Sequence, residues 1–331
     1  MRLLVTGGAG FIGSNFIRYI QQKYPEHKIT NVDKLTYAGN LDNLKGIETK
    51  NYKFVKADIC NKKIIDKLVP KHDWVINFAA ETHVDRSIFA DHMFVMSNVV
   101  GVQVLCDACL KHKTKFLQIS TDEVYGSINE GNFKETDLLN PSSPYSSSKA
   151  GGELLAHSFW KTYGLPVRIT RSSNNFGPYQ CPEKLIPLMI TNALNDKSLP
   201  VYGTGMNVRD WLYVEDNCVG IDTVLHNGAD GEIYNIGGGN TKPNMEIVKL
   251  ILEHLSKPES LIEYVKDRPG HDFRYSLDSD KIRKLGWQPK YAFSDAIKLT
   301  IDWYLKNEDW WKKEIKKAKL RKFQQKVRHD F

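Results

Sequence analysis

The fold is decided at the start of the chain by the sequence RLLVTGGAGFIGSN, which spans residues 2–15. Its first residues, Arg2–Thr6, have the apolar pattern of a short strand, and a helical pattern follows the loop. The loop carries Gly7, Gly10 and Gly13, which allow a tight turn and a close approach of a pyrophosphate to backbone N–H groups. A strand before these glycines and a helix after them predict a dinucleotide-binding unit.

The second strand indicates which dinucleotide is bound. Lys28–Val32 ends in Asp33, twenty residues beyond Gly13. A carboxylate at this place accepts a hydrogen bond from a ribose 2′-hydroxyl and repels a 2′-phosphate. We therefore predict NAD rather than NADP, the alternative being a structural glycine turn and a surface aspartate.

Another stretch of the chain places reactive groups at the same edge of the predicted sheet. The apolar run Phe116–Ile119 indicates a buried strand, and Thr121, Asp122 and Glu123 follow where it ends. Ligands of α/β sheets bind at the carboxyl ends of the strands. We therefore expect a hydroxyl and two carboxylates beside the cofactor.

Tyr145 and Lys149 lie four residues apart in a predicted helix that opens at Pro144, so they share one helical face. A cation at this spacing lowers the pKa of the tyrosine and makes a phenolate base available near neutral pH. Three other Tyr-x-x-x-Lys pairs are interpreted as ordinary surface pairs: Tyr19/Lys23, Tyr24/Lys28 and Tyr52/Lys56.

The order of strands and helices predicts the α/β class with two domains. We expect a Rossmann-type doubly wound parallel sheet in residues 1–172, with a returning segment near 208–226. After the strand Val167–Arg171 the alternation is lost, and a smaller α+β domain in residues 173–311 is expected to bind the substrate. Residues 312–331 form a basic tail with a helical pattern.

Composition bounds the class of protein. The chain has 331 residues, of which 41% are hydrophobic and 26% charged, as in soluble globular enzymes. We find no apolar run of membrane-spanning length and no leader sequence, and we expect a cytoplasmic protein. The five cysteines are too scattered for a disulfide framework, and Cys106 and Cys109 lack a second pair, so no metal site is expected.

The net charge of +7 lies in the tail, where nine Lys or Arg residues face only Glu314 and Asp330. Leu320, Phe323 and Val327 recur at helical spacing, which indicates an amphipathic helix with a solvated basic face. Attraction to nucleic acid is the alternative, but the tail has neither an aromatic stacking pattern nor a groove-reading motif.

A long helix is expected over Met93–Cys109, and it is apolar on more than one face. The helix after Pro144 is similar. Such helices need cover on two sides, so we predict that they pair with their copies in a homodimer. The alternative is that the second domain of the same chain covers them.

Separate loops provide cations that suit a substrate with a diphosphate group. These residues are Lys184, Arg209, Arg268 and His271. His83 lies in a loop at a strand end. We interpret it as an orienting or hydrogen-bonded polar group rather than as the group that transfers a proton.

With these motifs the chain resembles the extended short-chain dehydrogenase/reductases and, among them, the dTDP-glucose 4,6-dehydratases, over nearly its whole length up to the tail. The glycine loop and Tyr145/Lys149 are shared across the superfamily, whereas the Thr121–Asp122–Glu123 triplet is specific. The matching segments include residues 79–88, 173–187, 207–211 and 267–274.

The resemblance implies a lyase that removes water by internal redox with retained NAD. Tyr145, assisted by Lys149 and Thr121, would take the proton of the sugar 4-hydroxyl while hydride leaves C4. Glu123 would then remove the C5 proton as Asp122 donates a proton to the departing 6-hydroxyl. The product would be a 4-keto-6-deoxy sugar nucleotide, which feeds the synthesis of deoxysugars such as rhamnose.

The expected binding residues come from the loops after the strands and from the resemblance. The cofactor would contact Gly7, Gly10, Phe11, Ile12, Gly13, Asp33, Lys34, Leu35, Thr36, Asp58, Ile59, Ala79, Ala80, Thr82, Asn98, Tyr145, Lys149 and Asn175. The resemblance implies that the sugar nucleotide would contact Thr82, Asn174, Glu183, Lys184, Leu185, Pro200, Tyr202, Arg209, Asn244, Arg268 and His271.

Several other functions share part of this pattern. A UDP-glucose 4,6-dehydratase would keep the same triplet, although the segments at 207–211 and 268–271 favour dTDP. A C4-epimerase or a sugar-acid decarboxylase needs Tyr145 and Lys149 but not the acid and base pair Asp122 and Glu123. A non-catalytic NAD-binding scaffold, with the tail recruiting nucleic acid or an acidic partner, would not need the reactive groups at all.

Overall fold

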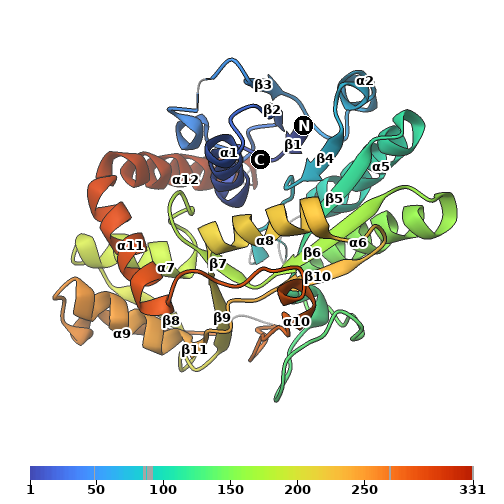
Figure 1. Ribbon diagram of the computed structural model, residues 1–331. Coiled ribbons are helices and arrows are strands. Elements are labelled where there is room, and N and C mark those ends of the chain that lie inside the picture. Colours follow the sequence, from blue (N-terminus) through green and yellow to red (C-terminus); the bar gives the residue numbers. More distant parts are fainter. Residues whose placement is uncertain (48, 85–86, 88–91, 268–269, 330–331) are drawn as a thin grey trace.

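The computed structural model describes residues 1–47, 49–84, 87, 92–267 and 270–329, and its description of side chains ends at Ala318. Figure 1 shows a large sheet with helices on both sides and a smaller part beside it.

Seven parallel strands form the large sheet in the order β10-β6-β5-β4-β1-β2-β3. Their order reverses on either side of β1, which is the strand arrangement of a doubly wound fold. The strands are β1 (Arg2–Thr6), β2 (Lys28–Asp33), β3 (Tyr52–Lys56), β4 (Trp74–Asn77), β5 (Lys115–Thr121), β6 (Val167–Ser172) and β10 (Ile233–Ile236).

Helices cover both faces of this sheet because neighbouring residues of a strand point to opposite faces. Leu3 and Val5 of β1 belong to the core beneath one set of helices, whereas Leu4 belongs to the core on the other side. The first face is covered by α1 (Phe11–Lys23) and α8 (Val214–Asn227), and the second by α2 (Lys62–Leu68), α5 (Gly101–His112) and α6 (Pro144–Tyr163). The predicted Rossmann-type sheet is confirmed.

The smaller part has its own apolar core, to which two short sheets, three helices and the start of the C-terminal helix contribute. A three-stranded sheet has the order β11-β9-β7, and β12 pairs with β8. The elements are β7 (Asn174–Phe176), α7 (Leu185–Leu194), β8 (Leu199–Tyr202), β9 (Val208–Tyr213), β11 (Thr241–Pro243), α9 (Asn244–His254), β12 (Ile262–Val265) and α11 (Phe293–Lys306).

The chain returns to the large sheet through α8 and β10. Of the segment near 208–226 that the sequence indicates, β9 pairs with β7 and β11, whereas α8 packs against α1 and β6. The remaining elements are short or terminal: η1 (Leu41–Leu44), η2 (Val69–Lys71), η4 (Asp122–Tyr125), η5 (Glu259–Leu261), α10 (Asp280–Arg283) and α12 (Glu308–His329).

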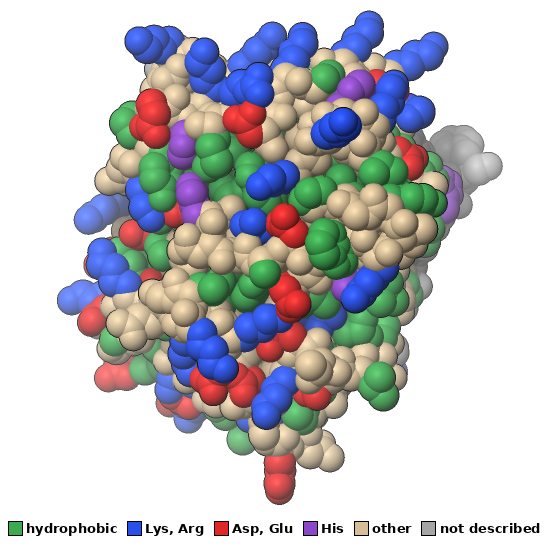
Figure 2. Space-filling view, turned by 45° about the vertical axis from the view of Figure 1, so that its right-hand side comes forward, with side chains coloured by type: hydrophobic (Ala, Val, Ile, Leu, Met, Phe, Trp, Pro, Cys, Tyr) green, Lys and Arg blue, Asp and Glu red, His purple; other side chains and the backbone are tan. Residues whose placement is uncertain are grey.

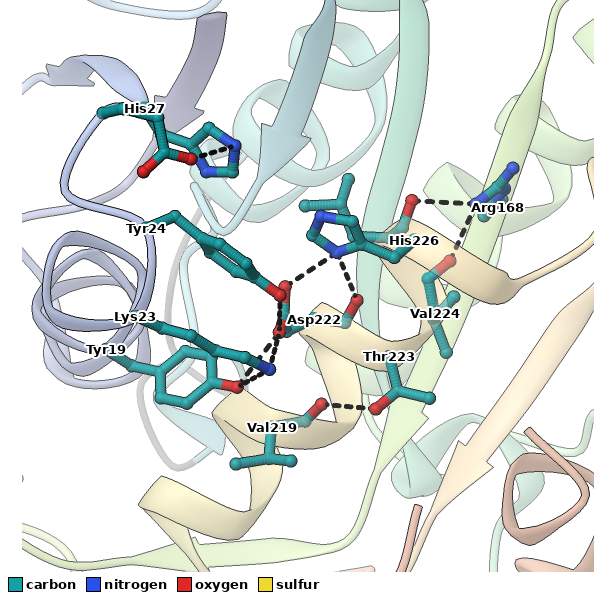
Figure 3. Close-up of polar contacts among 12 residues, drawn as sticks. Tyr19, Lys23, Tyr24, His27, Arg168, Val219, Asp222, Thr223, Val224 and His226 are labelled. Carbon is teal, nitrogen blue, oxygen red and sulfur yellow. Dashed lines mark hydrogen bonds and ion pairs between the residues drawn. The ribbon is translucent and has the colours of Figure 1, made fainter. Parts of the chain in front are cut away.

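The contact between α1 and α8 contains a polar cluster (Figure 3). The buried carboxylate of Asp222 accepts hydrogen bonds from Tyr19 Oη at 3.0 Å, Lys23 Nζ at 2.9 Å and Tyr24 Oη at 3.2 Å. His226 Nδ1 lies 2.9 Å from the other carboxylate oxygen. Tyr19 and Lys23 thus bond each other at an exposed contact, at 2.8 Å, and they share an acceptor, Asp222, that lies 199 residues beyond Lys23.

One helical segment runs from Met93 to His112 and contains a π-helical stretch, Met96–Val100. By length and composition alone it is suitable for crossing a membrane, which corrects the expectation that no apolar run is long enough. In this fold, 44% of its most apolar window is buried. A mostly buried core helix passes the same test, so this helix is weak grounds for a membrane protein.

Basic side chains gather at one edge of the molecule. Figure 2 shows Lys and Arg crowded along the upper edge, the edge that carries α2 and the end of α5 in Figure 1. Exposed lysines of these elements and of the adjoining residues are Lys62, Lys63, Lys67, Lys71, Lys111 and Lys113. Basic character is therefore not confined to the tail, although the net charge before residue 312 is zero.

Candidate active site

A cavity of about 300 Å³ lies where the carboxyl ends of β1, β2, β4, β5 and β6 meet the smaller part. This is the place where open α/β sheets bind ligands. The cavity joins the glycine loop at one end to Glu183 and Lys184 at the other. A single continuous space therefore contains the predicted cofactor loop and the predicted reactive groups.

The glycine loop is held in a shape that only small residues allow. Gly7 has φ +69° and donates its N–H to Val32 O at 2.8 Å, and an added Cβ would lie 2.5 Å from Ala79 N. At Gly10, by contrast, an added Cβ would meet only Gly7 O within 4 Å. Because the first turn of α1 has no acidic residue, its unpaired N–H groups and positive dipole end remain suited to a phosphate.

Asp33 is positioned by two backbone groups. Its carboxylate accepts from Ala9 N at 3.0 Å and from Leu35 N at 2.7 Å. Burial raises the pKa of Asp33, and these two hydrogen bonds oppose the shift. Next to it, Lys34 pairs with Asp58 at 2.7 Å. The loop and the carboxylate together fit the pyrophosphate and ribose of NAD.

The triplet at the end of β5 forms a short turn. Thr121 Oγ1 accepts the backbone N–H of Glu123 at 3.3 Å and donates to Asp122 Oδ1 at 3.2 Å. Asp122 is 2% exposed, and its Oδ2 has no hydrogen-bond partner among the described residues. Burial, followed by the charges of Glu123 and Asp210, raises the pKa of Asp122 well above its ordinary value. This carboxyl group is therefore suited to donating a proton near neutral pH.

The pair Tyr145 and Lys149 lies on the buried face of α6, beside the triplet. Lys149 Nζ donates to Ile119 O at 2.7 Å, and burial lowers the pKa of Lys149 to about 8. The pKa of Tyr145 is raised well above its ordinary value, first by burial and then by Glu123. The expectation of a lowered tyrosine pKa is therefore wrong, because burial and the charges of Glu123 and Asp122 raise the pKa of Tyr145 while Lys149 bonds a carbonyl group.

Local sequence fixes where α6 begins and how closely it packs. Ser143 and Ser146 form a reciprocal cap around Pro144, with N···O distances of 3.0 and 3.1 Å. On the same helix, an added Cβ at Gly152 would lie 2.0 Å from Asn98 O, so glycine permits the close contact with the π-helical stretch. Asn98 in turn bonds both backbone groups of Glu81, at 2.9 and 3.0 Å.

The chain matches the family described as GDP-mannose 4,6 dehydratase over residues 4–300. The chain belongs to this family. It is 51% identical to the low-salt glycan biosynthesis protein Agl12 of Haloferax volcanii, over 93% of this chain and all of that protein. It is also 49% identical to a dTDP-glucose 4,6-dehydratase of Streptomyces niveus, over 94% of this chain and 95% of the relative.

A solved structure shares the fold closely. DesIV, a dTDP-glucose 4,6-dehydratase of Streptomyces venezuelae crystallised with NAD, is 46% identical, with a TM-score of 0.93 over 95% of this chain and all of that chain. The resemblance inferred from the motifs is therefore confirmed at the level of the family and the fold.

Most of the predicted NAD-site and reactive residues of this family member line the cavity. All five predicted catalytic residues do so, and of the cofactor set only Leu35 and Asn98 do not. Leu35 is next to the lining and adopts φ +58°, whereas Asn98 is buried behind Glu81. The lining members of the cofactor set are Gly7, Gly10, Phe11, Ile12, Gly13, Asp33, Lys34, Thr36, Asp58, Ile59, Ala79, Ala80, Thr82, Tyr145, Lys149 and Asn175.

The predicted substrate residues divide into two groups. Thr82, Asn174, Glu183 and Lys184 line the cavity, and Lys184 Nζ donates to Thr82 O at 3.2 Å. Arg268 lies outside the described residues. The others do not line the cavity: Leu185, Pro200, Tyr202, Arg209, Asn244 and His271.

The contacts of Arg209 and His271 explain why they lie apart from the cavity. Arg209 is 5% exposed, donates to Val208 O, Phe273 O and Asp272 O, and stacks on Tyr275 at 4.4 Å. His271 pairs with Asp267 at 2.6 Å and contacts the ring of Tyr202. In this structure both side chains bind protein groups.

His83 reaches toward the smaller part, where its Nε2 lies 3.7 Å from Glu183 Oε2. Some cavity residues have no role in the sequence-based assignment, among them Glu81, Ser120, Ser173, Gln180 and Cys181. Their signals in the sequence are proximity to strand ends and, for Glu81, Ser173, Gln180 and Cys181, a place in the segments that match the family. Among the described residues no group of three His, Cys, Asp or Glu side chains could hold a metal ion.

Proposed function

We propose that this protein is a NAD-dependent nucleotide-sugar 4,6-dehydratase that converts dTDP-glucose into dTDP-4-keto-6-deoxyglucose and water. One observation carries the proposal: the carboxyl groups of Asp122 and Glu123 share a cavity with Tyr145, Lys149 and a glycine loop suited to NAD. An oxidation and an elimination can therefore occur on one bound sugar. NAD, when bound, supplies the hydride acceptor for C4 and later the hydride donor for C6.

The first step belongs to Tyr145, Lys149 and Thr121. Tyr145 takes the proton of the sugar 4-hydroxyl as hydride leaves C4, and Thr121 donates a hydrogen bond to the same oxygen. Protonated Lys149 stabilises the phenolate form of Tyr145 that accepts this proton, because an opposite charge nearby favours ionisation. The buried position of Tyr145, which is 6% exposed, keeps bulk water away from this proton transfer.

The second step belongs to the carboxylates. A ketone at C4 acidifies the C5 proton, which Glu123 removes while Asp122 donates its proton to the departing 6-hydroxyl. The pKa of Asp122, raised by burial and by Glu123, keeps this proton in place until it is needed. Water leaves, a proton returns from Glu123 to C5 as hydride returns to C6, and the product keeps its C4 ketone.

The choice of nucleotide is supported by the relatives, which include dTDP-glucose 4,6-dehydratases at 49% and 46% identity. UDP-glucose is the alternative substrate. The resulting 4-keto-6-deoxy sugar nucleotide is a precursor of deoxysugars, of which rhamnose is one.

The decisive experiment is to incubate the purified protein separately with dTDP-glucose and UDP-glucose in heavy water, without added cofactor. Product masses and the position of deuterium are then read by mass spectrometry and NMR. Loss of water with deuterium at C5 supports the proposal, and the faster nucleotide names the substrate. Inversion at C4 without water loss would indicate an epimerase, and no product even with added NAD would favour the non-catalytic scaffold.

We further propose that residues 1–172, together with α8 from the returning segment near 208–226, bind NAD, and that the rest of residues 173–311 binds the sugar nucleotide. All five cysteines are free thiols, which suits a reducing compartment such as the cytoplasm. No membrane or nucleic-acid partner is part of this proposal.

We propose a homodimer that pairs the Met93–His112 segment and α6 with their copies. The support is a set of exposed apolar side chains on these elements, namely Met93 at 48%, Val95 at 52%, Met96 at 40% and Leu154 at 56%. Light scattering after size-exclusion chromatography tests it: the double change Val95→Asp and Leu154→Asp should give a monomer, and a wild-type monomer would refute the pairing.

A further inference from the structure

The C-terminal helix α12 is docked by its first two turns. Trp311 is 1% exposed and donates its Nε1–H to Tyr304 O of α11 at 2.9 Å. The ring of Trp310 contacts Trp303 and Tyr179, with centroids 5.1 and 5.9 Å away. The start of α12 is therefore fixed to the smaller part of the molecule. Figure 1 shows that the helix then runs from α11 toward the large sheet near α1.

Two side chains of α12 bind the segment that follows β2. Trp310 Nε1 donates to Asn43 Oδ1 at 2.9 Å, and Asn40 Nδ2 donates to Glu314 Oε1 at 3.0 Å. Glu314 is 7% exposed and is also paired with Lys317 at 2.7 Å. A buried carboxylate is stable only when it is hydrogen-bonded or paired, so these partners hold Glu314 in place.

The same two asparagines hold the glycine loop. Asn40 N and Asn43 Nδ2 both donate to Ala9 O, each at 3.0 Å. The backbone N–H of Ala9 in turn donates to Asp33 Oδ2 at 3.0 Å. Hydrogen bonds thus lead without a gap from α12, through Asn40 and Asn43, to the loop that receives a pyrophosphate and to the carboxylate that receives a ribose.

We propose that α12 braces the NAD site and that Glu314 and Trp310 are positioning residues for cofactor binding. The inference rests on the proposed function, because it concerns the same dinucleotide site. Without the brace, Asn40 loses its bond to Glu314 and Asn43 loses its bond to Trp310. The glycine loop at Ala9, which both asparagines hold, must then be ordered when NAD binds. Ordering a loop on binding costs affinity, so a braced loop binds NAD more tightly.

The brace lies beyond the part of the chain that defines the family. The family match ends at residue 300, whereas α12 begins at Glu308. The proposed role gives Glu314, in the first residues of the basic tail, a function.

The test measures the dissociation constant of NAD for full-length protein stripped of nucleotide, by isothermal titration calorimetry. Glu314→Ala and Trp310→Phe should each weaken NAD binding by roughly tenfold, because each removes a partly or fully buried hydrogen bond. Glu314→Gln keeps an acceptor for Asn40 and should bind NAD nearly as the wild type does. The matched control is Glu308→Ala on the same helix, whose partner Lys312 is 53% exposed, and it should change nothing.

Kinetics separate positioning from a general loss of structure. At saturating NAD, Glu314→Ala should keep the wild-type kcat and the wild-type KM for the sugar nucleotide. If both Glu314→Ala and Trp310→Phe bound NAD as tightly as the wild type, the proposed brace would be wrong while the proposed function stood. The same would hold if Glu308→Ala lost as much NAD affinity as these two variants. Failure of the wild-type protein to bind NAD would instead overturn the proposed function, and the brace with it.

Discussion

At the scale of single residues, Asp122 and Glu123 show how neighbours in a chain acquire different chemistry. Asp122 is buried in the cavity wall, whereas Glu123 is only half-buried. Burial disfavours the charged form, so the proton stays on Asp122. The nearby charge of Glu123 adds to this effect. A general acid and a general base can thus occupy adjacent positions.

We expect Asp122→Asn to retain oxidation at C4 but to slow water loss, and Glu123→Gln to slow deuterium exchange at C5. Each proton transfer is worth on the order of 10² to 10⁴ in rate. Fluorescence of bound NADH in a single turnover reports the oxidation, and NMR reports the exchange. Exposed Glu130→Gln is the control for folding. Unchanged turnover in the Asp122→Asn, Glu123→Gln double variant would show that these groups do not catalyse.

Lys149 gives the reaction a pH dependence with a definite sign. Burial lowers its pKa from 10.5 to about 8, while the charge of Glu153 raises it. Since the protonated lysine stabilises the phenolate, kcat/KM should fall as pH rises through about 8. Glu153→Gln removes the charge that raises the pKa of Lys149, so the fall in kcat/KM should occur at a lower pH. If kcat/KM of the variant fell at the same pH as in the wild type, the coupling of Glu153 to Lys149 would be contradicted.

The Glu153→Gln experiment needs two controls. Glu153 also pairs with Arg171 inside the protein, so the variant is compared with the wild type by thermal unfolding at each pH. The matched control is Glu246→Gln, because Glu246 forms an exposed ion pair with Lys242. This substitution should leave the pH profile unaltered.

At the scale of elements, the contact between α6 and the π-helical stretch Met96–Val100 sets the position of Tyr145 and Lys149. Two adjacent glycines of α6 differ in this contact. An added Cβ at Gly152 would lie 2.0 Å from Asn98 O, whereas at Gly151 the nearest atom is Val99 Cγ2 at 3.4 Å. Of the two glycines, only Gly152 lies where the backbones of the two helices touch.

We expect Gly152→Ala to lower the free energy of unfolding by about 1–3 kcal/mol, because an overpacked core must shift. Gly151→Ala should leave it unchanged or raise it by up to about 1 kcal/mol, since alanine favours helix. Denaturant titration measures both. Equal effects of the two substitutions would show that the close contact does not select glycine.

At the scale of the whole molecule, Asp222 joins the first helix of the chain to a helix near its middle. It accepts from Tyr19, Lys23 and Tyr24, and its side chain is 3% exposed. The cluster thus attaches α8, which follows β9 of the smaller part, to the NAD-binding half.

Asp222→Ala should cost about 2 kcal/mol of unfolding free energy, since it leaves two tyrosine hydroxyls and a lysine without their acceptor. Thermal and denaturant unfolding measure the loss. Asp302→Ala is the control, because Asp302 is 38% exposed and lies 3.4 Å from His254. Similar losses in both variants would mean that the cluster contributes no more than a surface pair.

Local spacing in the sequence was sufficient to predict several features of this protein. The glycines between β1 and α1, Asp33 at the end of β2, the triplet after β5 and the pair Tyr145/Lys149 each follow from a strand end or a helical period. Parallel strands bring their carboxyl ends to one edge, so these groups must meet there. The fold and the family could be predicted for this reason.

Which distant groups become partners could be seen only in the folded chain. Folding turned Lys23 toward Asp222, buried Arg209 against backbone carbonyls, and placed Glu314 on Asn40 across 274 residues of chain. No local pattern specifies such pairs, because a charged side chain looks alike in sequence whether it binds a ligand, a carbonyl group or water. Packing of elements far apart in the chain, rather than residue type, settles that choice.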